Sequence, residues 1–120
     1  MSTIEEQRLC SYVECFNRHD LAGVMDCFDD HPVIVDMLGR RHEGRDEIRR
    51  FYELQFAMFP DARCDIKVVA GRASTGMAET DFRGTYAKTG KIVTASGPEV
   101  VQFAGDKIKG LRDYHRVTSD

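Results

Sequence analysis

The chain has 120 residues, of which 42% are hydrophobic and 31% charged, with a formal net charge of -3. This length and composition are typical of one globular domain with its own core, so we expect a single domain over residues 1–120. The charge balance excludes the strongly basic surface typical of nucleic-acid binding. No apolar run approaches the ~20 residues of a membrane helix, and the N-terminus does not resemble a signal peptide. We therefore expect a cytoplasmic protein with no nucleic-acid or membrane partner.

The cysteine and histidine spacings match no metal-binding signature. The four cysteines are Cys10, Cys15, Cys27 and Cys64, with no C-x-x-C pair among them, and the four histidines form no H-x-x-x-H pair. A domain of this size also needs no disulfide framework. We expect reduced, mostly buried thiols, no metal and no cofactor.

Three amphipathic segments in the first half of the chain predict helices over residues 3–18, 21–28 and 44–59. Asp20 is a good N-cap for the second helix, and Pro60 ends the third. The β-branched run 33–38 predicts a strand between the second and third helices.

After Pro60 the hydrophobic period changes to two. The expected strands are 63–73, 77–87, 91–104 and 107–117, separated by Gly76, Thr89-Gly90 and Gly105-Asp106. The order α-α-β-α-β-β-β-β predicts an α+β fold in which an antiparallel sheet curls around the helices.

Polar residues in phase with apolar faces are the candidate site residues, because a buried carboxyl must be paired, neutralised or used. Tyr12 lies within the apolar stripe of the first helix, Asp36 interrupts the first strand, and Glu99 falls on the more apolar face of 91–104. The alternatives are a plain core tyrosine, a solvent-facing Asp36, and a Glu99 that forms a salt bridge or turns outward at a bulge. Asp113 and His115 share one face of the last strand, where a carboxylate can orient and charge the imidazole.

With these residues in place, the sequence resembles the SnoaL-like and ketosteroid-isomerase-like branch of the NTF2-like superfamily. The likeness rests on the N-x-x-D-L break at 17–21, the stretch FDDHPVIVD at 28–36, which is similar to the family's F-x-D-D-x-x-x-x-x-D entry to the first strand, the start of the third helix at 42–48, and the hairpin at 101–108. It implies a cone-shaped fold: a strongly curved antiparallel sheet wrapped around three N-terminal helices, with an apolar pocket.

The resemblance also implies roles for these residues. By analogy with the steroid isomerases, Asp36 is the proton-shuttling base, and Tyr12 with a protonated Glu99 forms the oxyanion hole. By analogy with the SnoaL-like polyketide cyclases, Asp113 or His115 is the acid and base. Phe82, Val101 and Phe103 are expected to join Asp113 and His115 in contacting a small hydrophobic ligand.

The leading hypothesis is therefore a cofactor-independent, ketosteroid-isomerase-like enzyme that moves a proton next to the carbonyl of a hydrophobic ketone. A SnoaL-like cyclase, dehydratase or epoxide-opening enzyme is the second hypothesis, and a non-catalytic binding domain is the third. We also expect a homodimer, because the helices can cover only one face of the sheet and leave Val68, Tyr86 and Val100 on the other.

Overall fold

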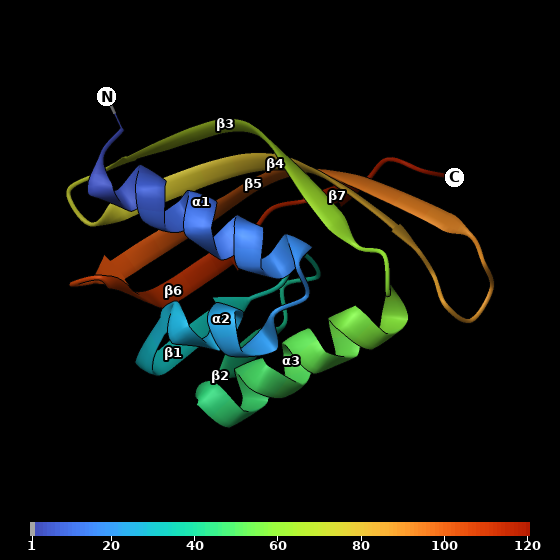
Figure 1. The fold of residues 1–120 in the computed structure, drawn as a ribbon, viewed down its shortest axis with the longest axis horizontal. Coiled ribbons are helices and arrows are strands. Elements are labelled where there is room, and N and C mark those ends of the chain that lie inside the picture. Colours follow the sequence, from blue (N-terminus) through green and yellow to red (C-terminus); the bar gives the residue numbers. More distant parts are fainter. Residues whose placement is uncertain (1) are drawn as a thin grey trace.

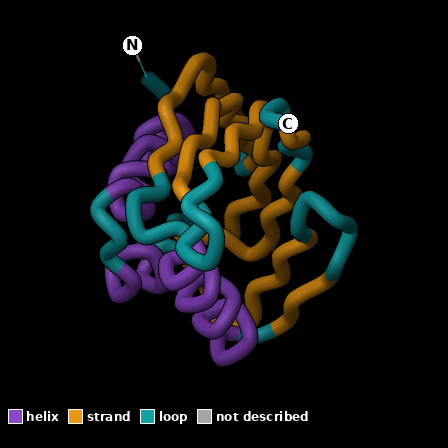
Figure 2. Tube along the Cα trace, turned by 90° about the vertical axis from the view of Figure 1, so that its right-hand side faces the viewer, coloured by secondary structure: helices purple, strands orange, loops and turns teal. Residues whose placement is uncertain are grey.

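Three helices pack against one side of a curved, open sheet in the computed structural model, which describes residues 2–120 (Figure 1). The helices are α1 (Ile4–Asn17), α2 (Leu21–Asp26) and α3 (Arg45–Met58). Figure 2 shows the helices gathered on one side of the molecule and most of the strands on the other. The α+β fold with three helices and a curved sheet is therefore confirmed.

Local capping explains where the first two helices begin. A reciprocal pair of hydrogen bonds joins Thr3 and Glu6, so that each side chain accepts a bond from the other residue's backbone N–H at the start of α1. The predicted N-cap Asp20 accepts a hydrogen bond from the backbone of Gly23 at 3.0 Å. The short α2 therefore begins where the sequence places it.

The sheet consists of seven strands, five of which are consecutive after α3. Its strands are β1 (Phe28–Val35), β2 (Arg41–Glu43), β3 (Arg63–Arg72), β4 (Thr75–Thr85), β5 (Ile92–Ala104), β6 (Lys107–Asp113) and β7 (Arg116–Val117). They follow the order β2-β1-β6-β5-β4-β3, and β7 pairs with β5 off this path. The central strands β4, β5 and β6 carry one face toward the helices, and this face provides the floor of the site.

Four features of the sheet differ from the sequence-based prediction. β1 runs parallel to β6, so the sheet is mixed and not wholly antiparallel. β1 also starts at Phe28 and ends at Val35, which leaves the expected 36–38 extension in a turn. The first hairpin turns at Ala73 and Ser74, both with positive φ, and not at Gly76. Finally, the expected strand 107–117 breaks into β6 and β7.

Gly76 lies inside β4, where the side chain of Leu9 occupies the space that a larger residue would fill. A Cβ on Gly76 would come within 2.6 Å of Leu9 Cδ1 on α1. The glycine therefore allows α1 to approach β4 closely, and it marks a helix contact where the sequence suggested a turn.

All four cysteines are free, but only Cys64 is buried, so the expectation of mostly buried thiols is wrong for the other three. Within residues 2–120, no helix is both long enough and apolar enough to cross a membrane.

Candidate functional site

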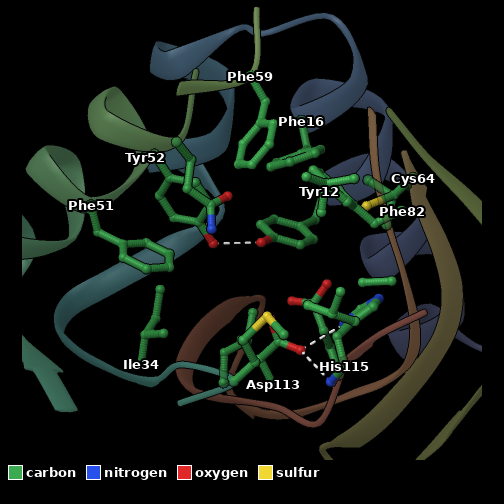
Figure 3. Close-up of a pocket in the computed structure, with 18 residues that line it drawn as sticks. Tyr12, Phe16, Ile34, Phe51, Tyr52, Phe59, Cys64, Phe82, Asp113 and His115 are labelled. Atoms are coloured by element: carbon green, nitrogen blue, oxygen red, sulfur yellow. Dashed lines mark hydrogen bonds and ion pairs between the residues drawn. The ribbon is translucent and has the colours of Figure 1, made fainter. Parts of the chain in front are cut away.

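A cavity of about 200 Å³ lies between the helices and the inner face of the sheet (Figure 3). Its walls are largely apolar, and the aromatic residues among them are Tyr12, Phe16, Phe51, Tyr52, Phe59 and Phe82. Polar groups come from two sides: the tyrosine hydroxyls from α1 and α3, and opposite them the carboxyls of β5 and β6 with the imidazole of the segment between β6 and β7. Figure 3 shows Tyr12 and Tyr52 on the side of the cavity opposite Asp113 and His115. An apolar molecule in this space would have polar groups at both ends.

The hydroxyls of Tyr12 and Tyr52 form a short hydrogen bond across the two helices. Both side chains are buried, at 4% and 2% exposed. Burial, and then the charge of nearby Glu99, raises the pKa of each hydroxyl well above 10. Both tyrosines therefore stay protonated, and since one hydroxyl donates to the other, the accepting hydroxyl keeps its own proton for a ligand.

Glu99 lies on β5, directly opposite Asp113 on β6 and Ala78 on β4. These three residues form one row across the inner face, and both carboxyls line the cavity. Burial, and then the charge of Asp113, raise the pKa of Glu99, the charge of His115 partly opposes them, and the net pKa is about 7. No hydrogen bond from the described residues contributes to the shift. The Glu99 carboxyl can therefore hold its proton at neutral pH.

Asp113, His115 and Thr80 form a hydrogen-bonded chain at the floor of the cavity. Asp113 Oδ1 lies 2.6 Å from His115 Nδ1, and His115 Nε2 lies 2.7 Å from Thr80 Oγ1. His115 and Thr80 are 8% and 0% exposed. Burial lowers the pKa of His115, but the hydrogen bond and charge of Asp113 outweigh it, so the net pKa is raised. The imidazolium form is favoured, and in it both ring nitrogens donate to protein oxygens and neither accepts a proton from a ligand.

Gly97 makes room for His115 to enter the core. Strand β6 ends at Asp113, and the following segment 114–115 crosses β5. There the backbone N–H of Tyr114 donates to Pro98 O at 2.9 Å. Gly97 has φ +151, and a Cβ there would meet Tyr114 O at 2.5 Å and His115 Cα at 2.8 Å. Only a residue without a side chain allows this crossing, which brings His115 under the cavity.

Asp36 does not line the cavity. It follows β1, and its Oδ1 accepts hydrogen bonds from the backbone of Leu38 and of Arg40, each at 2.9 Å. His42 Nε2 lies 2.9 Å from Asp36 Oδ2. Burial raises the pKa of Asp36, but these hydrogen bonds outweigh it and the net pKa is lowered. The expected alternation with Ile34 fails because the strand ends at Val35, so the carboxyl closes a turn and does not point into the cavity.

Of the other residues predicted to contact a ligand, some line the cavity and some do not. Phe82, Asp113 and His115 lie on the cavity wall. Val101 and Phe103 do not line it: they share the inner face of β5, but they pack in the core, at 0% and 4% exposed.

Sequence reasoning missed Tyr52 and Thr80. Tyr52 belongs to the apolar face of α3, where nothing in the pattern distinguishes it from a core aromatic. Thr80 lies in a polar stretch of β4, and its inward phase along that strand was the available signal. Within residues 2–120, no group of three His, Cys, Asp or Glu side chains is arranged to hold a metal ion.

The sequence matches the family model described as a SnoaL-like domain over residues 10–111. No curated protein matches it. Similar solved structures include AclR, a putative hydroxylase from Streptomyces galilaeus, with a TM-score of 0.79 at 16% identity over 94% of this chain and 77% of that chain. A putative SnoaL-like polyketide cyclase from Shewanella putrefaciens CN-32 has a TM-score of 0.82 at 14% identity, covering 98% and 91% of the two chains.

A third similar structure is a hypothetical protein with a ketosteroid-isomerase-like fold from Catenulispora acidiphila DSM 44928, in complex with trimethylamine. Its TM-score is 0.75 at 15% identity, over 88% of this chain and 82% of that chain. At these identities the likeness shows a shared fold.

Proposed function

The chain belongs to the SnoaL-like domain family, and on this basis we propose that its cavity catalyses proton transfer on a small apolar compound that carries a carbonyl group. One observation carries the proposal: Glu99 and Asp113 are opposite each other on neighbouring strands, line the same cavity, and have different partners. Glu99 favours its protonated form, whereas Asp113 is hydrogen-bonded to His115, so a hydrogen-bond donor and a proton acceptor lie side by side.

Asp113 is the base in this proposal. Both hydrogen bonds that it accepts from His115 fall on Oδ1, at 2.6 and 2.8 Å, so Oδ2 is available to take a proton. The favoured imidazolium of His115 stabilises the ionised carboxylate, and buried Thr80 fixes the ring from its other side. His115 and Thr80 are therefore positioning residues.

Tyr12 and protonated Glu99 are the hydrogen-bond donors. When Asp113 removes a proton from the carbon beside a carbonyl, negative charge develops on the carbonyl oxygen, and these two donors stabilise the resulting enolate. Tyr52 supports Tyr12 through the hydrogen bond between their hydroxyls. Asp113 then returns the proton to the same or another carbon of the enolate, so the step needs no further reactant.

This assignment favours the SnoaL-like hypothesis over a steroid-isomerase arrangement with Asp36 as the base. The Asp36 carboxyl already accepts hydrogen bonds from Leu38, Arg40 and His42, and it is not part of the cavity wall. The same acid and base suit ring closure, dehydration or isomerisation, since each can begin with removal of an acidic C–H proton.

The experiment follows exchange of the α-hydrogens of small cyclic ketones in D₂O by NMR. Exchange detects enolate formation whatever product the natural substrate gives. We expect exchange well above the buffer rate for the native protein and a rate near that of buffer for Asp113→Asn. If native protein binds a phenol, a mimic of the enolate, without accelerating exchange on any ketone, the cavity is a binding site and the catalytic proposal fails.

We also propose that the chain forms a homodimer through the outer face of the sheet. Val68 and Ile92 are 48% and 46% exposed on the strands β3 and β5, and exposed apolar groups on a sheet favour a partner. Light scattering at high micromolar concentration should give twice the chain mass of 13.6 kDa. A monomer mass would refute the dimer.

A further inference from the structure

Two residues connect the cavity with the surface. Of the residues that line the cavity, Met37 and Val117 are the most exposed to solvent, at 37% and 56%. The other lining residues are buried or partly buried. Met37 and Val117 therefore mark the mouth of the cavity.

The two mouth residues are held differently. Val117 belongs to β7, and its backbone is paired with Ala95 of β5. Met37 belongs to the loop 36–40, which lies between β1 and β2 outside any strand. Methionine is also unbranched and flexible, so it can change rotamer with little strain. Met37 is thus the movable side of the mouth.

Asp36 holds the loop 36–40 in place. The backbone closes on itself, because Asp36 N–H donates to Arg40 O and Gly39 N–H donates to Asp36 O, each at 2.9 Å. The Asp36 side chain adds the hydrogen bonds from Leu38 and Arg40 on Oδ1 and the contact with His42 on Oδ2. This one carboxyl therefore ties three points of the chain together.

His42 extends this connection to the cavity wall. Its ring lies 4.6 Å, centroid to centroid, from the ring of Phe51 on α3, which lines the cavity. The side chains of Asp36 and His42 are only 12% and 24% exposed. The loop that carries Met37 is thus anchored to the wall of the same cavity that it borders.

We propose that Met37 is the gate of the cavity and that Asp36 is a positioning residue for this gate, so that the loop 36–40 controls which molecules enter. The proposal concerns the same cavity as the proposed function and adds the element that selects ligands by size. A small side chain at position 37 would widen the mouth, and a larger one would narrow it. Loss of the Asp36 acceptors would release the loop, whereas asparagine keeps an oxygen for the two backbone donors and an amide that can pair with His42.

The cavity provides its own reporter of access. Cys64 lines the cavity and is 7% exposed, whereas Cys10 on α1 lies outside it and is partly exposed. The two thiols are labelled with N-ethylmaleimide in the intact protein, and the rate for each is measured by mass spectrometry of peptides. Burial raises the pKa of Cys64 to about 12, so all variants are compared at one pH by the ratio of the Cys64 rate to the Cys10 rate.

Met37→Ala should raise this ratio by about fivefold or more, because local opening of the mouth exposes Cys64. The matched control is Leu38→Ala, which removes a neighbouring side chain that is 69% exposed and does not line the cavity. This control should leave the ratio unchanged. Asp36→Ala should raise the ratio of the Cys64 rate to the Cys10 rate, whereas in the separate variant Asp36→Asn the ratio should stay near the native value.

The proposal is overturned if Met37→Ala and Asp36→Ala leave the ratio unchanged, or if Leu38→Ala raises it as much as Met37→Ala. If an alanine variant loses its fold, which faster labelling of Cys10 would reveal, Met37→Phe decides: a lower ratio supports the gate, and an equal or higher ratio refutes it. Labelling measures access and not turnover. A gated but inactive protein therefore refutes only the proposed function, and an active protein without a gate refutes only this inference.

Discussion

Asp113 and His115 are two residues apart, and a single carboxylate oxygen of Asp113 accepts both the backbone N–H of His115 at 2.8 Å and its ring Nδ1 at 2.6 Å. This double contact bends the chain between β6 and β7 and turns the imidazole into the core. It also leaves the second carboxylate oxygen free for the cavity. One local turn therefore positions the ring and the base together.

Stability should depend on pH through Glu99. Its pKa is raised from 4.5 to about 7 in the folded protein, so between these values the native state binds more protons than the unfolded state. Stability therefore falls as pH rises through this window, and the full penalty is present above about 7. Glu99→Gln, which cannot ionise, should melt at a higher temperature than the native protein at pH 8 and at a similar temperature at pH 5. If the native protein melted at a higher temperature than Glu99→Gln at pH 8, the raised pKa of Glu99 would be contradicted.

His115 should also make the native protein less stable as pH rises. Its pKa is raised in the fold, so its contribution to stability is present below the unfolded pKa of about 6.5 and is lost as pH rises through the folded pKa. Replacement of His115 by Gln should therefore destabilise the protein more at pH 5.5 than at pH 8.5. Chemical denaturation at the two pH values measures the difference, and an equal loss at both would show that the ring carries no favoured charge.

The exchange rate should fall as pH rises above about 7, because Glu99 must hold its proton to donate a hydrogen bond. In Glu99→Gln the amide N–H still donates but does not titrate. The variant should therefore lose this alkaline fall while it keeps part of the rate. If the exchange rate of Glu99→Gln still fell at alkaline pH as it does in the native protein, the fall would belong to another group.

The two tyrosines should contribute unequally to rate. Tyr12→Phe removes a donor to the enolate and should lower the exchange rate by roughly 10² to 10³. Tyr52→Phe removes the support of that donor through the hydroxyl pair, and it should lower the rate by about tenfold, the smaller effect typical of one weakened hydrogen bond. Rates for the two variants under the same conditions test the order. A larger loss in Tyr52→Phe would make Tyr52 the direct donor.

Gly97→Ala should displace the segment 114–115 from its place over β5. The added Cβ would lie within 2.8 Å of the backbone of both Tyr114 and His115, at a φ that favours glycine. We expect a loss of about 1–3 kcal/mol in the free energy of unfolding. The His115 ring signals should also shift in the NMR spectrum, whereas Gly105→Ala, in an open turn with φ +60, should leave them in place. Unshifted His115 signals in Gly97→Ala would show that the crossing does not position the ring.

The helices and long strands were predictable because their periodicity reflects one buried face. Glu99 could be found from its phase on β5, since Ala95, Val101 and Phe103 on the same face are buried. Asp36 could not be judged in this way. Its phase with Ile34 is correct only while the strand continues, and the strand ends one residue before Asp36 because the carboxyl closes a turn.

Tyr52 and Thr80 were not found because their roles depend on tertiary contacts. Tyr52 matters through a hydroxyl on another helix, 40 residues away in sequence, and Thr80 through an imidazole 35 residues away. The parallel pairing of β1 with β6 joins strands from opposite ends of the chain, and no local pattern specifies it. These features arise only when the sheet closes over the helices.

In the proposed reaction Asp113, and not Asp36, is the base. The most direct test is the rate of α-hydrogen exchange on one ketone for native protein, Asp113→Asn and Asp36→Asn, with melting temperatures to verify the fold. We expect Asp113→Asn to lose about 10² to 10⁴ in rate, as removal of a general base does, and Asp36→Asn to remain within a few fold of native because asparagine can still close the turn. Loss of exchange in Asp36→Asn together with its retention in Asp113→Asn would contradict the account.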